Sequence, residues 1–204
     1  MDRTVKKTGL IIALFLVMAT ASTALTLKLS TPLNAEQIHQ ASKTSEFYGS
    51  MGDYLLTHGY VQQAQRAYEI GLSYGGSPAL LHNLGKIAYD RTELEDARDL
   101  FQKAIDLDNS YAKAFHSLGI LDTEEGRYND AVMHFGQYAK LTGDADSHCQ
   151  LGNALALSAR YDNADTVDEA ISEYKTCISM DPAYEGAENN LRVLERVKEI
   201  QSAS

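Results

Sequence analysis

Three residues that could bind a metal recur at a near-constant interval along the chain: His82, His116 and Cys149. Imidazole and thiolate groups are zinc ligands, and each must lie about 2 Å from the ion. If the three residues occupy equivalent places on successive helical units, helix packing holds them roughly 10 Å apart. We therefore predict no metal site from this row. No other histidine or carboxylate spacing matches a zinc or calcium loop.

The chain has two cysteines, Cys149 and Cys177, and neither belongs to a CxxC motif. Two cysteines do not make a disulfide framework, so we predict that Cys177 simply fills a small position in the core. The sequence contains no nucleophile elbow, phosphate-binding loop, HExxH motif or paired-carboxylate arrangement. These observations predict a protein that is not an enzyme and needs no cofactor.

The formal net charge of the chain is −10. An acidic protein without a basic stripe repels the phosphate backbone, so nucleic-acid binding is not expected. The simplest interpretation of this charge is a solvated acidic surface. Basic partner proteins are the weaker of the two interpretations.

The first 27 residues have the pattern of an export signal or a membrane anchor. Three basic residues precede an apolar run at 10–18, and small residues follow at 19–24, as in a cleaved signal peptide. The charge-free stretch 9–27 is also close to the ~20 residues that span a bilayer, so both interpretations stay open. In either case the basic residues stay in the cytoplasm. We therefore expect an extracytoplasmic protein of the cell envelope, either anchored by a single pass or periplasmic or secreted.

Four segments of the chain carry the same residue types at matching positions. A glycine on a first helix is followed on a second helix by an alanine and, four residues later, by an aromatic residue. The glycines are Gly52, Gly85, Gly119 and Gly152; the alanines are Ala64, Ala97, Ala131 and Ala170; the aromatic residues are Tyr68, Phe101, Phe135 and Tyr174. The small residues let two helices approach closely, and the aromatic ring fills the space between units. No unit can bury its apolar face alone, so the units must stack.

This pattern resembles the tetratricopeptide-repeat (TPR) family over residues 45–182. The resemblance implies an all-α fold, a right-handed TPR superhelix of about four helix-turn-helix repeats followed by a C-terminal capping helix. The expected divisions are a signal peptide or transmembrane anchor at 1–27, a linker or stalk at 28–44, repeats at 45–77, 78–111, 112–144 and 145–182, and the capping helix at 183–204.

Capping residues predict where several helices begin. Ser77 precedes Pro78, which suits a first helical turn, and Thr92 with Glu95 has the spacing of a capping box. Thr166 with Glu169 gives the same signal in the fourth repeat.

Two departures from the repeat pattern stand out. An insertion around residues 161–166 lengthens the fourth repeat, and its polar composition predicts an exposed loop, which either adds a contact or is neutral. Tyr138 occupies a site where the family prefers alanine. Its ring must therefore wedge the third and fourth repeats apart or turn outward.

In TPR proteins the first helix of each repeat lines a concave groove. The resemblance thus predicts a peptide-binding groove formed by Asp53, His82, Lys86, Tyr89, Lys113, His116 and Asn153. It also places Asp146, Ala156 and Leu157 on the groove side of the fourth repeat. Tyr89 is the best single anchor, because aromatic residues dominate binding hot spots. Only Asn83 and Lys113 match the five-residue clamp with which some TPR proteins grip carboxylates, so that activity is not predicted.

We therefore expect a protein–protein interaction scaffold, an adaptor or assembly factor, on the extracytoplasmic side of a membrane. A peptide or a partner helix would occupy the groove. The alternative is a self-assembling structural protein, in which the groove of one copy takes the stalk of the next to form a homo-oligomer. The membrane is a further partner through residues 9–27 if they are not cleaved.

Overall fold

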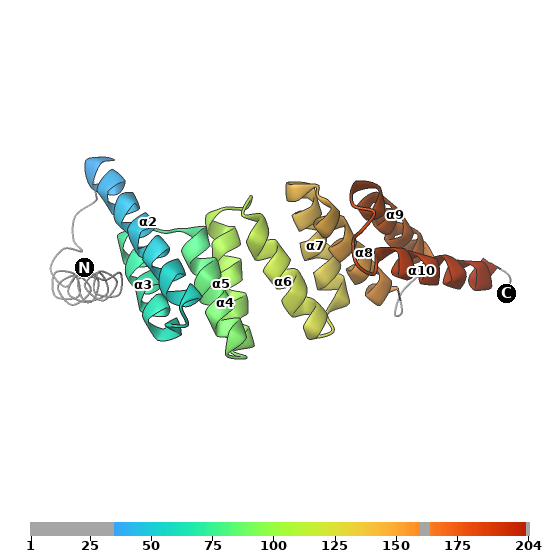
Figure 1. Ribbon diagram of the computed structural model, residues 1–204, viewed down its shortest axis with the longest axis horizontal. Helices are drawn as coiled ribbons and strands as arrows, with labels where there is room; N and C mark the ends of the chain where they lie inside the picture. The colour runs from blue at the N-terminus through green and yellow to red at the C-terminus, as the bar shows by residue number, and fades with distance from the viewer. Residues whose placement is uncertain (1–34, 160–163, 203–204) are drawn as a thin grey trace, which may run out of the picture. The chain divides into compact units, whose positions relative to one another are not determined.

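The computed structural model describes residues 35–159 and 164–202. The chain divides into two units, residues 1–40 and 41–204, and the fold presented here is that of the second. Helix α2 (Ala35–Thr57) begins in the first unit and ends in the second. Every regular element within the described ranges is a helix (Figure 1).

Consecutive helices of the second unit pair as hairpins, and the hairpins follow one another in chain order (Figure 1). The remaining helices are α3 (Val61–Tyr74), α4 (Pro78–Asp90), α5 (Leu94–Leu107), α6 (Ala112–Glu124), α7 (Tyr128–Thr142), α8 (Ala145–Ser158), α9 (Ala164–Met180) and α10 (Ala187–Ser202). Helix α4 packs on α5, α6 on α7, and α8 on α9, with α10 following the last hairpin. The predicted all-α TPR superhelix of about four repeats with a capping helix is confirmed.

The close approach inside each hairpin depends on the glycine and the aromatic residue of the repeat. A Cβ atom added at Gly85 would lie 2.6 Å from the ring of Phe101, and one at Gly119 would lie 2.8 Å from the ring of Phe135. Ala97 is fully buried on the second helix of its hairpin. The glycine therefore leaves the space that the aromatic ring occupies, which is the packing that the repeat pattern predicts.

The predicted helix start at Ser77 and Pro78 is confirmed, whereas the capping box predicted at Thr92 is wrong. Ser77 is the residue before α4 and Pro78 begins that helix, but the Ser77 side chain makes no capping hydrogen bond. Thr92 adopts a left-handed backbone with φ of 62°, and its N–H donates to the Tyr89 carbonyl. Thr92 thus lies in the turn between α4, which ends at Asp90, and α5, which begins at Leu94, and it does not cap α5.

The start of the fourth repeat's second helix also differs from the prediction. Residues 164–166 already belong to α9, so Thr166 lies inside the helix and does not cap it. The exposed loop predicted around 161–166 is therefore wrong for these three residues, and residues 160–163 lie outside the described part of the chain.

The capping helix begins later than expected. Tyr184 donates its N–H to the Asp181 carbonyl in a turn, and Gly186 has a left-handed φ of 81°. Helix α10 starts only at Ala187, which is buried, because the chain must first turn away from α9. A left-handed backbone suits glycine, which has no Cβ atom.

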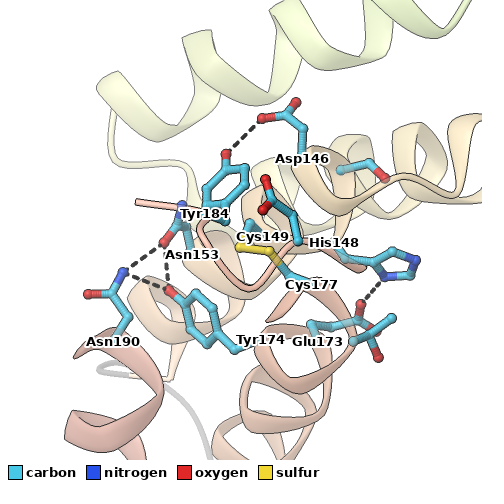
Figure 2. The surroundings of a disulfide bond; sticks show 12 residues. Asp146, His148, Cys149, Asn153, Glu173, Tyr174, Cys177, Tyr184 and Asn190 are labelled. Carbon is cyan, nitrogen blue, oxygen red and sulfur yellow. Dashed lines mark hydrogen bonds and ion pairs between the residues drawn. A yellow bond between two sulfur atoms is a disulfide. The ribbon is translucent and has the colours of Figure 1, made fainter. Parts of the chain in front are cut away.

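A disulfide bond joins Cys149 of α8 to Cys177 of α9 (Figure 2). Both side chains are buried, so the prediction that Cys177 fills a small core position describes its burial but misses its bond. The two cysteines lie 28 residues apart in the sequence, and the hairpin brings their Cα atoms to 5.4 Å. The bond ties the two helices of the fourth repeat together.

Candidate peptide-binding groove

The residues predicted for the groove all lie on the first helix of a hairpin. Asp53 is on α2; His82, Lys86 and Tyr89 are on α4; Lys113 and His116 are on α6; and Asn153 is on α8. Their exposure differs widely. Asp53, Lys86 and Lys113 are exposed, Tyr89, His116 and Asn153 are half-buried, and His82 is buried.

Asp53 and Asn153 accept hydrogen bonds from the tyrosines of their own repeats. The hydroxyl of Tyr68 donates to Asp53 at 2.7 Å, and the hydroxyl of Tyr174 donates to Asn153 at 2.5 Å. Burial, followed by the hydrogen bond to Asp53, raises the pKa of Tyr68. Both acceptors directly follow the repeat glycine, so the same hydrogen bond joins the two helices of the first and of the fourth repeat.

An asparagine from the next first helix completes each of these contacts. Asn83 of α4 donates to Asp53 at 2.9 Å, and Asn190 of α10 donates to Asn153 at 3.3 Å. The second and third repeats have phenylalanine in place of tyrosine, and no hydroxyl is available there. The polar side chains predicted at the two ends of the groove thus brace adjacent repeats as well as facing the surface.

His82 is buried and contacts residues of its own repeat and of the next. Its Nε2 is 2.9 Å from the Ser117 hydroxyl, and its ring lies 5.4 Å from that of Phe101 and 5.6 Å from that of Tyr111. Burial lowers the pKa of His82 to about 4, so the ring is neutral at neutral pH. We expected His82 to flank a ligand, and the structure gives it a packing role because the Tyr111 ring closes over it.

Tyr89 links the second repeat to the third. Its hydroxyl donates to Glu124 of α6 at 2.5 Å, and this hydrogen bond, with burial, raises the pKa of Tyr89 to about 12. The ring is half-buried, and Lys86 lies exposed one turn earlier on the same helix. The hydroxyl is therefore engaged inside the protein, while the ring and the Lys86 ammonium group remain accessible to a ligand.

The half-buried ring of Tyr138 packs beside the core between the third and fourth repeats. Its ring centroid is 4.9 Å from that of His116, and its hydroxyl donates to Asp146 at 3.2 Å. Tyr184 donates to the other oxygen of Asp146 at 2.7 Å (Figure 2). Ala139, the next residue of α7, takes the buried position instead. Tyr184 was not among the predicted site residues, because we expected the capping helix to begin at residue 183 and to include it. The helix begins at Ala187, so Tyr184 lies in the turn before it.

The fourth repeat and α10 enclose a hollow of about 620 Å³. Asn153, Ala156 and Leu157 line it from α8, as the resemblance predicts for the groove side of this repeat. Val193 and Val197 line it from α10, and these two valines are 55% and 37% exposed. The hollow is therefore mainly apolar, with polar amides at the end formed by Asn153.

No cluster of three or more metal-binding side chains occurs within residues 35–159 and 164–202. Cys149, which forms a row with His82 and His116, is bonded to Cys177 and offers no thiolate. The helices in this same part of the chain include none that is long and apolar enough to cross a bilayer. The candidate signal or anchor at 1–27 lies outside the described residues.

Comparison with known proteins identifies the repeat. The tetratricopeptide repeat model matches residues 78–111, and no curated protein matches the chain. A crystal structure of MamA protein is 26% identical with a TM-score of 0.64, over 79% of this chain and 86% of that one. YrrB, described as a TPR protein with an unusual peptide-binding site, is 21% identical with a TM-score of 0.64, over 74% and 76%. PilF of Pseudomonas aeruginosa is 16% identical with a TM-score of 0.64, over 78% and 71%.

The stacked hairpins and the lined hollow define an α-solenoid, a class of repeat protein that presents an extended surface to other proteins. More particularly, residues 78–111 are a tetratricopeptide repeat, and the chain has the fold of TPR proteins.

Proposed function

We propose that this protein is an interaction scaffold, an adaptor or assembly factor, that binds a segment of a partner protein along the first helices of its repeats. The hollow between α8 and α10 carries the proposal, because it combines accessible apolar side chains with the Asn153 and Asn190 amides. Apolar pockets with a few fixed polar groups are the usual form of a binding site. The described residues offer side chains for binding and no arrangement that points to catalysis.

The similarity to YrrB supports the same proposal. YrrB is described as having a peptide-binding site, and its fold resembles that of this chain over most of both proteins. The exposed Lys86 and the half-buried ring of Tyr89 extend the surface from the fourth repeat to the second. A peptide or a partner helix is the ligand that such a surface suits.

We further propose that the repeats function outside the cytoplasm. The basic leader and apolar run of the first 27 residues favour export. The disulfide between Cys149 and Cys177 gives independent support, because disulfides persist in oxidising compartments and are rare in the cytosol.

Photocrosslinking in cells tests the groove. A benzophenone amino acid replaces Lys86, Tyr89 or Leu157 on the groove side, and Met133 of α7 serves as the control because its side chain is 61% exposed. We expect the three groove positions to trap the same partner proteins, which the control position does not trap. Crosslinks that are identical at all four positions would contradict the proposal. Crosslinks only to a second copy of the chain would instead support the self-assembling alternative.

Thiol trapping tests the location. Cells are acid-quenched, and free thiols are labelled with a polymer-tagged maleimide before and after reduction. We expect the full chain to gain two labels only after reduction, and a variant lacking residues 1–27 to be labelled directly. Two free thiols in the full chain would sink the extracytoplasmic proposal.

A further inference from the structure

We propose that Tyr138, Asp146 and Tyr184, together with His116, form a subsite for the guanidinium group of an arginine in the bound partner. This inference rests on the proposed function and deepens it, since it names one residue type that the groove selects. The four residues come from α6, α7, α8 and the turn before α10, so only the stacked repeats bring them together.

Asp146 is the centre of the cluster. Its Oδ1 accepts the Tyr184 hydroxyl at 2.7 Å, and its Oδ2 accepts the Tyr138 hydroxyl at 3.2 Å. Its side chain is nevertheless 43% exposed. A carboxylate has about four lone-pair sites, so each oxygen can still accept one hydrogen bond from a ligand. The two N–H groups of a guanidinium fork fit such a pair of oxygens.

Among the residues that the structure describes, no lysine or arginine balances the charge of Asp146. Lysine and arginine residues within the described ranges form no ion pair with Asp146 or Asp144. His116 lies 4.0 Å from Asp146, but burial lowers the pKa of His116, so the ring is mostly neutral at neutral pH. Burial and these two aspartates together raise the pKa of Tyr138 to about 12. The cluster thus presents an uncompensated negative charge.

The rings around Asp146 favour a planar cation. His116 and Tyr138 lie with their ring centroids 4.9 Å apart. Tyr184 reaches Asp146 from the turn before α10 (Figure 2). Aromatic rings within about 6 Å attract a cation, and guanidinium stacks on them better than ammonium does. An anionic ligand is excluded by the carboxylate. Arginine can therefore donate hydrogen bonds to both oxygens of Asp146 and stack on the neighbouring rings.

The position of Tyr138 in the repeat supports a binding role. The equivalent residues in the other three repeats are Gly71, Ala104 and Cys177, all buried and small. Of the four repeats, only the third places a large ring there; the ring packs beside the core formed by Ala131, Phe135 and Ala154, and its hydroxyl reaches Asp146. The hydroxyl of Tyr138, which packing against that core does not require, donates to Asp146.

The test uses N-acetyl-arginine amide as the probe and NMR of the full chain as the readout. The ring signals of Tyr138 and Tyr184 are followed during titration at neutral pH. N-acetyl-citrulline amide, which has nearly the same shape without the charge, is the control ligand. The first variant is Asp146→Asn, which keeps an oxygen and the shape of the side chain but loses the charge. The matched control is Asp90→Asn, at an exposed residue that ends α4.

We expect the arginine probe to shift both tyrosine signals and the citrulline probe to leave them unchanged. Asp146→Asn should weaken binding at least about tenfold, because it removes a charge-assisted pair of hydrogen bonds. Asp90→Asn should change binding less than twofold. Equal weakening by the two variants would reduce the effect to general electrostatics and overturn the proposal, as would unshifted tyrosine signals.

The outcome is separable from that of the proposed function. If the probe fails while Lys86, Tyr89 and Leu157 still crosslink to specific partners, the groove binds proteins but has no arginine subsite. If the probe binds at Asp146 but no partner is captured, the subsite exists without the proposed scaffold role.

Discussion

The Nδ1 atom of His82 is buried and has no hydrogen-bond partner among the described residues. Desolvation is the main reason that its pKa is lowered to about 4, and the positive charges of Lys86 and Lys113 and the nearby His116 add to the effect. The folded protein therefore holds His82 neutral under conditions in which an unfolded chain would protonate it.

This difference predicts a loss of stability in acid. In the unfolded chain His82 titrates near its ordinary pKa of 6.5, whereas in the folded chain it titrates at about 4. Between these values the unfolded state binds more protons, so the contribution of neutral His82 is full above pH 6.5 and is lost as the pH falls toward 4. We expect about 2–3 kcal/mol less stability at pH 4.5 than at pH 7.5 from this group.

Urea denaturation of His82→Gln measures the effect. The variant should lose this part of the pH dependence, because glutamine does not titrate. The control is His58→Gln, whose imidazole is on an exposed residue after α2. Identical pH dependence in the wild type and in His82→Gln would contradict the assignment.

At the scale of the helices, the distance between the two helices of a hairpin is set by glycine. The ring of Phe101 occupies the space beside Gly85, where a Cβ atom would come within 2.6 Å of the ring. Gly136 on α7 is different, because its nearest neighbour would be a Leu151 methyl group at 3.9 Å. Packing therefore requires a glycine at position 85, whereas position 136 has room for a Cβ atom.

Alanine substitutions separate the two cases. Gly85→Ala should lower the free energy of unfolding by about 1–2 kcal/mol, since overpacking outweighs the gain in helix propensity. Gly136→Ala should be neutral or raise it by up to about 1 kcal/mol, because only the propensity term acts. Thermal or urea denaturation monitored by circular dichroism measures both. A stabilised Gly85→Ala variant would show that the hairpin can open without cost.

At the scale of the stacked repeats, each repeat is stabilised mainly by its contacts with the neighbouring repeats. In the part of the chain that the structure describes, the main contacts between helices join consecutive helices, as in other solenoids. The buried Leu194 and Ala187 of α10 cover the core of the fourth repeat, which contains Val167, Ile171 and the Cys149–Cys177 bond. Helix α10 therefore ends the stack and protects its last hairpin.

Substitution in α10 should destabilise the nearest repeat most. Leu194→Ala removes a side chain that is 8% exposed, and we expect a loss of about 2–3 kcal/mol. Hydrogen exchange should show faster opening of α8 and α9 than of α4 and α5, because the damage lies at one end. Val193→Ala on the same helix, at a residue 55% exposed, is the control and should change little. Uniform loss of protection across all hairpins would instead mean that the repeats unfold as one unit.

The sequence by itself determined the helical repeat, because small and aromatic residues at fixed offsets can pack in only a few ways. Gly85 with Phe101, and Gly119 with Phe135, allowed the hairpins to be predicted. The same regularity located the first helices, on which the predicted groove positions Lys86, Tyr89 and Leu157 lie. These features depend on contacts within one repeat or with the next, which the period of the sequence encodes directly.

Only the tertiary structure decided which polar groups of those positions are accessible. His82 is buried because the ring of Tyr111 closes over it, and Cys149 is bonded to a residue on the facing helix. Asp122 is fully buried and pairs with Arg98, Arg127 and His134. Tyr184 meets Asp146 across 38 residues. Exposure and partner choice depend on side chains from distant segments, so no local pattern could specify them.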